Sequence, residues 1–405
     1  MLLTANHPNG LVDAVAVMRC TPRPIRFIAK APLFGLPVVG FLARRIRAVP
    51  VYRRQDDPSQ MARNVDAFAA VSEALGQGDV VCVFPEGIAH SEPHLQPLKT
   101  GAARMALGAE ASSRFALGVR IVPIGLLYRD KRRFRSAATV EIGAPIGCLD
   151  LAARYAHDPV GAADELTERI GRALERHTVN VDQWDDLPML EAAHKILMAE
   201  HHDEARAERV IELRQLATAF ASMRARDPLL AESLGTRVMA YGRRLAALGL
   251  TPGDLDTRYS AATVSRFVVR TLVGLVVGLP FAVLGFTAFF VPYRLTALSV
   301  AISKPPRELV GTVKVGVGAV LFALWYGGLL AAVSLTLAWW CTVLCAIVLP
   351  VAGLAAIVVK ERHDEARDDV AVFFRFANRR ALRALLLERH AALARDLDEQ
   401  IRARR

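Results

Sequence analysis

A histidine and an aspartate near the start of the chain could perform acid–base chemistry. The stretch Asn6–Asp13 reads Asn-His-Pro-Asn-Gly-Leu-Val-Asp, which predicts a strand end at His7, a tight turn and a helix whose first turn carries Asp13. Folded back, the Asp13 carboxylate could accept from one ring nitrogen of His7 and leave the other as a base. Taken alone, the stretch also fits a plain turn at Asn9 and Gly10, with Asp13 only complementing the helix dipole.

A second stretch could bind an anion. The sequence Val-Phe-Pro-Glu-Gly (83–87) follows the apolar run Val80–Val83 and leads to Pro-Leu-Lys-Thr-Gly (97–101). This pattern predicts a strand, a Pro-Glu-Gly turn and a helix start, which would present backbone N–H groups to an anion beside the positive charge of Lys99. An ordinary strand-loop-helix connection is the alternative.

Two further stretches have the form of short strands. Residues 49–54 (Val-Pro-Val-Tyr-Arg-Arg) end in Arg53 and Arg54, and more arginines precede them at Arg44, Arg45 and Arg47. One guanidinium group can bind two phosphate oxygens at once, although isolated arginines more often lie on a solvated surface. Ile121–Gly125 (Ile-Val-Pro-Ile-Gly) predicts a strand that carries an edge proline.

The order and spacing of these stretches resemble the glycerophospholipid acyltransferase superfamily. That family has four blocks: His-x4-Asp, a Gly-x-x-Phe-x-x-Arg type block, Phe-Pro-Glu-Gly, and a Val-Pro-x-Gly type block. The resemblance covers about residues 4 to 147. It implies an α/β fold with a mixed sheet flanked by helices. It also implies direct attack of an acceptor hydroxyl on an acyl thioester, carried by coenzyme A or acyl carrier protein, without a covalent acyl-enzyme, a cofactor or a metal.

The resemblance also implies roles for individual residues. His7 would be the general base, and Asp13 would orient it. The implied substrate-binding residues are Arg53 for the acceptor's phosphate, Glu86 and Gly87 for the acceptor pocket, Lys99, and Pro123 beside the acyl chain. Further candidates for the pocket are Asn6, Asn9, His90, Ser91 and His94. Neither Ser91 nor a cysteine needs to act as a nucleophile.

Some features depart from the commonest family pattern. Five residues rather than four separate His7 from Asp13, and Ala89 stands where many acylglycerol-phosphate acyltransferases carry an arginine. These features, with His90 and residues 97–99, resemble the branch that acylates glycerol-3-phosphate or dihydroxyacetone phosphate. Acylation of a lysophospholipid such as 1-acylglycerol-3-phosphate is the runner-up. An inactive acyltransferase-like membrane scaffold is the alternative of another class.

The chain is expected to contain four regions. Residues 1–155 predict the acyltransferase α/β domain, and the family normally has more chain before its histidine block, so we expect a truncated N-terminus. The helical pattern of residues 156–265 predicts a helical extension, and the apolar stretches of residues 266–360 predict a membrane region. Residues 361–405 predict a basic amphipathic helix that lies on anionic lipid or on the catalytic domain. The polar cluster His201, His202, Asp203 and Glu204 predicts a solvated helical face rather than a metal site.

Composition points to a membrane protein with anionic partners. The 405 residues are 53% hydrophobic, with a mean hydropathy of +0.27 and a net charge of +11. Phospholipid headgroups, a phosphorylated substrate or coenzyme A fit this charge. Nucleic acid fits least, because no nucleic-acid-binding motif is present. The five cysteines lack metal-ligand spacing, and two of them lie in an apolar run, which predicts small buried hydrophobes in a reducing compartment.

Two apolar stretches form the predicted membrane region. Residues 267–292 carry no charge after Arg270 and contain Pro280 and Pro292. Residues 315–359 carry no charge at all, long enough for two passes of roughly 20 residues each, joined by a turn near 336–339. Basic residues flank both stretches at Arg266, Arg270, Arg294, Lys304, Arg307, Lys314, Lys360 and Arg362. If all lie on the cytoplasmic side with the catalytic domain, the first stretch is re-entrant and the second a hairpin. Three full spans and a buried soluble bundle are the alternatives.

Overall fold

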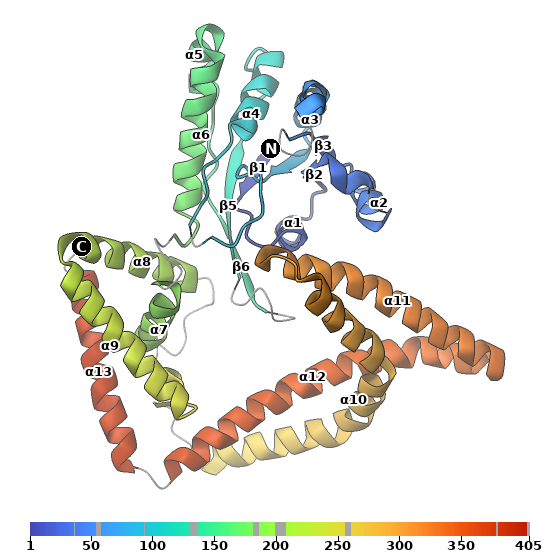
Figure 1. The fold of residues 1–405 in the computed structure, drawn as a ribbon, viewed down its shortest axis with the longest axis vertical. Coiled ribbons are helices and arrows are strands. Elements are labelled where there is room, and N and C mark those ends of the chain that lie inside the picture. The colour runs from blue at the N-terminus through green and yellow to red at the C-terminus, as the bar shows by residue number, and fades with distance from the viewer. Residues whose placement is uncertain are drawn as a thin grey trace. The chain divides into compact units, whose positions relative to one another are not determined.

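The computed structural model describes residues 1–35, 37–53, 58–92, 94–128, 136–180, 186–198, 208–255, 261–377 and 380–402. The chain divides into two compact units (Figure 1). The first contains Met1–Trp184, Ala205–Ala217 and Pro306–Thr312, and the second contains Asp185–Glu204, Thr218–Pro305 and Val313–Arg405.

The first unit is built on a mixed sheet, as the resemblance implies, and the structure gives this sheet six strands. Its strands are β1 (Leu2–Ala5), β2 (Ile25–Lys30), β3 (Val49–Val51), β4 (Val80–Val83), β5 (Ile121–Tyr128) and β6 (Ala138–Ile142), in the order β3-β2-β4-β1-β5-β6. All neighbouring pairs are parallel except β5 with β6. In register, Thr4 of β1 lies between Val83 of β4 and Pro123 of β5.

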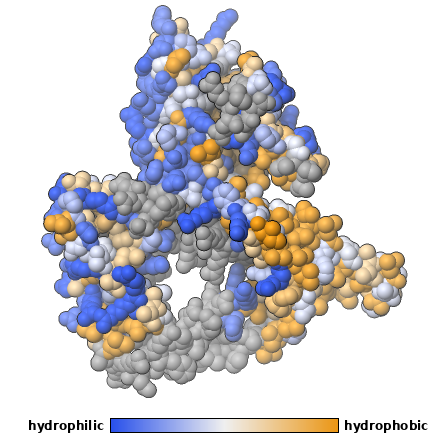
Figure 2. All heavy atoms as spheres, viewed as in Figure 1, coloured by the Kyte–Doolittle hydropathy of each residue, from blue (hydrophilic) through white to orange (hydrophobic). Residues whose placement is uncertain are grey.

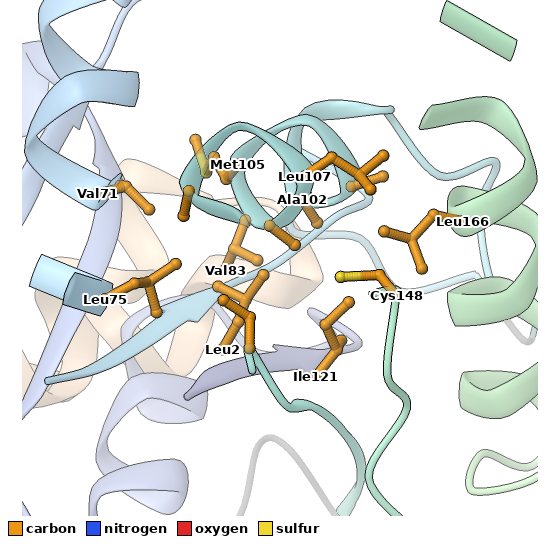
Figure 3. Packing of buried hydrophobic residues seen from close by; sticks show 14 of the residues in the cluster. Leu2, Val71, Leu75, Val83, Ala102, Met105, Leu107, Ile121, Cys148 and Leu166 are labelled. Atoms are coloured by element: carbon orange, nitrogen blue, oxygen red, sulfur yellow. The ribbon is translucent and has the colours of Figure 1, made fainter. Parts of the chain in front are cut away.

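Helices cover both faces of this sheet. The helices of the unit are α1 (Leu11–Met18), α2 (Pro37–Arg45), α3 (Asn64–Gly76), α4 (Gly101–Ser112), α5 (Ala152–His157) and α6 (Pro159–Glu175), with 3-10 turns at Ala31–Gly35, Pro58–Arg63 and Leu149–Leu151. Side chains of α3, α4 and α6 share one core with Leu2, Val83 and Ile121 (Figure 3). Val17 of α1 belongs to the core on the other face. The central strands are therefore apolar on both sides, which explains their unbroken hydrophobic runs.

Helix α6 lies beyond residue 155, where the predicted acyltransferase domain ends, and it packs within the first compact unit. Its residues Leu166, Ile170 and Leu174 are all buried in the core of the first unit. They recur every four residues, so they form one stripe, and that stripe packs on the α/β core rather than within a separate helical extension. The first unit accordingly continues to Trp184.

The second unit contains a helical cluster and the apolar helices. Its elements are α7 (Asp186–Met198), the end of α8 (Glu208–Arg226), α9 (Pro228–Ala247), a 3-10 turn η4 (Pro252–Leu255), α10 (Ala261–Ser303), α11 (Val310–Thr336) from residue 313 onward, α12 (Trp339–Ala377) and α13 (Arg380–Arg402). The 3-10 turn η5 (Arg307–Leu309) and the first turn of α11 belong to the first unit. The predicted polar cluster at 201–204 lies outside the described residues.

The C-terminal helix is placed differently from the prediction. Leu386, Leu393 and Leu397 of α13 are buried, and the helix packs against α7 and η4. The Arg383 guanidinium donates to the Leu255 carbonyl at 2.7 Å. The apolar stripe of α13 thus packs against α7 and η4 within the helical cluster of the second unit. The apolar stripe of an amphipathic helix can pack against any apolar protein surface that it reaches.

Among the described residues, three helices are long and apolar enough to cross a membrane: Gly278–Ser303, Arg307–Thr336 and Trp339–His363. Only 6 to 17% of each apolar window is buried, and hydrophobic side chains cover the surface of this region (Figure 2). In a soluble helical bundle these apolar side chains would be buried in the core, so their exposure argues against that alternative. Helix α11 ends at Thr336 and α12 begins at Trp339, which confirms the predicted turn. Helix α10 continues through Pro280 and Pro292 and bends along its length (Figure 1).

Candidate active site

The candidate residues gather where the parallel strands end. His7 follows β1, the turn Pro85–Gly87 (the Gly87 turn) follows β4, and Arg53 follows β3. Because these strands are parallel within one sheet, their carboxyl ends lie along the same edge. Residues of three of the four blocks recognised in the sequence are thereby brought to one end of the sheet.

Asn6 aligns the chain just before His7. Its side-chain amide donates to the Leu126 carbonyl at 3.1 Å, and its side-chain oxygen accepts from the Leu126 N–H at 2.7 Å. These two bonds prolong the β1–β5 pairing beyond the end of β1. Asn6 therefore positions the backbone directly before His7.

His7 and Asp13 form the expected hydrogen bond. The distance between His7 Nδ1 and Asp13 Oδ2 is 2.9 Å, and the same Oδ2 accepts from the Asn9 N–H at 2.7 Å. Asp13 is fully buried, whereas the His7 side chain is 20% exposed. An ionised carboxylate only accepts, so His7 Nδ1 carries the proton and Nε2 is left as an acceptor. This is the tautomer that a general base requires.

Gly10 makes this turn possible. Its φ of 57° lies in the left-handed region, which residues with a side chain rarely adopt. The Asp13 N–H donates to the Gly10 carbonyl at 3.2 Å, so Asp13 enters the first turn of α1 and points back at the histidine. The fifth intervening residue, one more than the commonest pattern has, is accommodated in this turn.

Two aromatic residues support the pair, and neither was assigned a role from the sequence. The Phe84 ring stacks on the His7 ring, with centroids 4.1 Å apart and 14° between the planes. Tyr128 ends β5, and burial, with a smaller effect of the Asp13 carboxylate, raises the pKa of its hydroxyl. The position of Phe84 directly before Pro-Glu-Gly was the available signal for its role. Tyr128 had none.

Glu86 ties two loops together. It is buried, and its Oε1 accepts from the His7 N–H at 2.8 Å. Its Oε2 accepts from the Gln96 N–H at 2.8 Å and bonds His90 Nε2. Because His90 Nδ1 accepts from the Glu92 N–H at 3.1 Å, the proton of His90 lies on Nε2 and is donated to Glu86. Glu86 therefore holds the backbone of His7, and its charge is satisfied internally.

Two cations meet at the Gly87 turn. Arg53 Nη1 donates to the Gly87 carbonyl at 2.9 Å. The exposed Lys99 side chain lies over Gly87, where a β-carbon would be only 2.8 Å from Lys99 Nζ. The Lys99 N–H donates to the Pro85 carbonyl at 2.8 Å, which anchors its backbone to the same turn. A guanidinium and an ammonium that both approach the same turn are groups suited to binding a phosphate or carboxylate.

The remaining predicted residues lie around this arrangement. Asn9 is buried, His94 is exposed, and the Ser91 hydroxyl is buried without a hydrogen-bond partner in the described part of the chain. Pro123 is buried in β5, and its carbonyl accepts from the Gly143 N–H at 2.8 Å. In the described ranges no group of three or more His, Cys, Asp or Glu side chains could hold a metal ion.

Comparison with known proteins identifies the N-terminal region. A family model described as Acyltransferase matches residues 1–127. Glycerol-3-phosphate O-acyltransferase 1 of Saccharomyces cerevisiae is 31% identical over 182 residues, which is 44% of this chain and 24% of that protein. Glycerol-3-phosphate O-acyltransferase 2 of the same yeast is 36% identical over 135 residues, 33% of this chain and 18% of that protein. A 1-acyl-sn-glycerol-3-phosphate acyltransferase of Bacillus subtilis is 31% identical over 99 residues, 24% of this chain and 45% of that protein.

These matches agree with the resemblance to the glycerophospholipid acyltransferase superfamily, and the match to the Acyltransferase family model covers residues 1–127. The chain spans a quarter or less of the length of the two yeast relatives. No solved structure gave a significant match.

Proposed function

We propose that the protein is a membrane-bound O-acyltransferase that moves a fatty acyl group from an acyl thioester to glycerol-3-phosphate or dihydroxyacetone phosphate. One observation carries the proposal. His7 has Nε2 available as a base, because Nδ1 bonds Asp13. Its backbone N–H bonds Glu86 of the Gly87 turn, and Glu86 also bonds the Gln96 N–H in the loop that follows. A base and an anion site on one connected framework suit a substrate that carries both a hydroxyl and a phosphate.

In the proposed reaction, His7 Nε2 takes the proton of the acceptor hydroxyl as its oxygen attacks the thioester carbonyl carbon. The carbon–sulfur bond then breaks, and the thiol leaves with a proton returned from His7. Asp13, within 2.9 Å of Nδ1, stabilises the imidazolium that forms in between. The donor is acyl-CoA or acyl carrier protein, and the scheme needs no further cofactor.

The buried cysteines are poor nucleophiles, which supports direct attack. Burial raises the pKa of the Cys148 thiol to about 11, and burial also raises the pKa of Cys82. Both thiols have no exposed surface. Because the thiolate is the nucleophile, these groups are nearly unreactive near neutral pH.

The acceptor class is inferred from the two cations at the Gly87 turn. Arg53 and Lys99 suit a phosphate, which both glycerol-3-phosphate and 1-acylglycerol-3-phosphate carry. The yeast relatives are named for the first acceptor and the Bacillus relative for the second. Acylation of 1-acylglycerol-3-phosphate is therefore the second candidate. Purified membranes offered both acceptors with a radiolabelled acyl donor distinguish the two by the product formed.

The third candidate, an inactive scaffold, is disfavoured by the completeness of the site. A His7→Ala variant tests it, because general-base assistance contributes roughly 10²–10⁴-fold to the rate. His157→Ala, an exposed histidine at the end of α5, is the matched control. Loss of turnover in the first variant alone supports an enzyme. Equal activity of both variants would contradict the role of His7.

We further propose that α10 enters the membrane and returns, whereas α11 and α12 form a spanning hairpin. The first half of α10 runs antiparallel to α12: a β-carbon at Gly278 would lie 2.8 Å from Val359, and one at Gly353 would lie 3.2 Å from Phe289. The α13 helix, which follows α12, contacts Leu255, which precedes α10. The start of α10 and the end of α12 then belong on one side of the membrane.

The second half of α10 runs back along α11. Trp325 Nε1 donates to the Ala288 carbonyl at 2.7 Å, and a β-carbon at Gly318 would lie 3.5 Å from Thr296. Trp325 lies 15 residues into α11, or about 22 Å at the helical rise of about 1.5 Å per residue. The bend of α10 is thus near Pro292 and within the bilayer, whose hydrocarbon core is about 30 Å thick.

Single cysteines test this topology and the cytoplasmic side that the flanking basic residues favour. We expect Arg243→Cys, Lys304→Cys and Glu388→Cys to be labelled by an impermeant maleimide from the cytoplasmic side, and Leu337→Cys from the other side. Labelling of positions 243 and 304 from opposite sides would require α10 to cross the membrane, contrary to the proposal.

A further inference from the structure

The His7–Asp13 turn contacts a segment that follows it by about 300 residues. The Leu11 N–H donates to the Thr312 hydroxyl oxygen at 3.1 Å. A β-carbon at Gly10 would lie 2.7 Å from that oxygen and 3.3 Å from the Glu308 carbonyl oxygen. Thr312 belongs to the first turn of α11, and Pro306–Thr312 lies within the same compact unit as the sheet.

The contact is close from the other side as well. A β-carbon at Gly311 would lie 2.9 Å from Asn9 Oδ1 and 3.3 Å from Val12 Cγ2. Glycine thus stands at the point of closest approach on both segments, at Gly10 and at Gly311. A side chain at either position would push the two backbones apart.

Helix α1 needs a cap that its own sequence does not supply. The first N–H groups of a helix have no acceptor within the helix, and a preceding Ser, Thr, Asp or Asn usually supplies one. Here the preceding residue is Gly10, and no side chain of its own caps the helix. The Thr312 hydroxyl fills this need at Leu11, two residues before Asp13.

We propose that Thr312 and Gly311 are positioning residues for the His7–Asp13 pair. The start of the apolar helix α11 thereby caps the helix that carries the aspartate. The inference rests on the proposed function, and it assigns the α10–α11 connection a part in catalysis.

The test compares Thr312→Val with Thr312→Ser in the full-length protein in membranes. Valine has the same shape as threonine but lacks the hydroxyl oxygen that accepts from the Leu11 N–H. Since a lost cap shifts the local equilibrium by about fivefold to tenfold, we expect kcat to fall by about that factor while KM for the acceptor stays within about twofold. Serine should restore kcat. Thr336→Val is the matched control, because the Thr336 hydroxyl bonds only carbonyls of its own helix.

Gly311→Ala gives a second, independent perturbation. The added methyl group would press on Asn9, so kcat should again fall without a change in the amount of protein extracted from membranes. The inference is overturned if Thr312→Val behaves like Thr336→Val, or if serine does not rescue a loss. If His7→Ala keeps full activity, the proposed function fails instead, so the two failures are distinguishable.

Discussion

Replacement of Asp13 by asparagine separates the charge of this residue from its geometry. In Asp13→Asn, the side chain can turn either its oxygen or its NH2 group toward the Asn9 N–H, which now lies 2.7 Å from Asp13 Oδ2. Two donors cannot face each other at that distance, so the oxygen must take this position. The same oxygen then still accepts from His7 Nδ1, and the productive tautomer of the histidine is kept.

What the asparagine loses is the negative charge beside the imidazolium. A hydrogen bond to a charged partner contributes about 1.5–3 kcal/mol and a neutral one about 0.5–1.5 kcal/mol. The difference of about 1–2 kcal/mol corresponds to a fall in kcat of about 5- to 30-fold. Asp13→Ala also leaves the buried Asn9 N–H and His7 Nδ1 without their acceptor, so we expect about 100-fold or more.

The assay is steady-state acyl transfer by the purified full-length protein in lipid nanodiscs, with kcat determined for the wild type and both variants. Thermal unfolding of each variant shows whether the fold is kept. If Asp13→Asn were as inactive as Asp13→Ala, the Asn9 N–H would not orient the amide and the reasoning would be wrong. Full activity of Asp13→Asn would show that the charge has no part in the reaction.

Three further predictions concern other parts of the site. Arg53→Lys should raise KM for the acceptor about 3- to 10-fold and leave KM for the donor unchanged, because a single ammonium cannot hold both the Gly87 carbonyl and a phosphate as the guanidinium fork does. Steady-state kinetics with each substrate varied in turn check this. Glu86→Gln should lower the free energy of unfolding of the catalytic unit by about 1–3 kcal/mol, because an amide NH2 must then face a buried donor. Denaturant titration measures it, and an unchanged midpoint would argue against the tether. A thiol whose pKa is raised from 9.0 to about 11 has about 100-fold less thiolate at pH 8, so Cys148 should be alkylated at least that much more slowly than a free thiol at that pH, and faster as the pH rises. Mass spectrometry of the alkylated peptide gives the rate, and rapid labelling of Cys148 in the native protein would refute the burial of this thiol.

Much of the site could be predicted from local sequence. His7 and Asp13 are six residues apart, and a Pro-Asn-Gly turn between a strand and a helix brings such near neighbours together. The apolar runs at 80–83 and 121–125 predicted the strands β4 and β5, and the resemblance implied the mixed sheet that contains them. The long uncharged stretches predicted the apolar helices, because an uncharged run of that length is typical of helices that cross a bilayer.

Other features depend on contacts between distant residues, and tertiary structure alone decided them. Glu86 bonds the His7 N–H across 79 residues, Asn6 bonds Leu126 across 120, and Thr312 bonds Leu11 across 301. Each contact joins a side chain to a backbone group. Every residue carries such backbone groups, so no hydrophobic period or motif marks which one is bonded. The stripes of α6 and α13 were visible in the sequence, but only packing determined which surface each one covers.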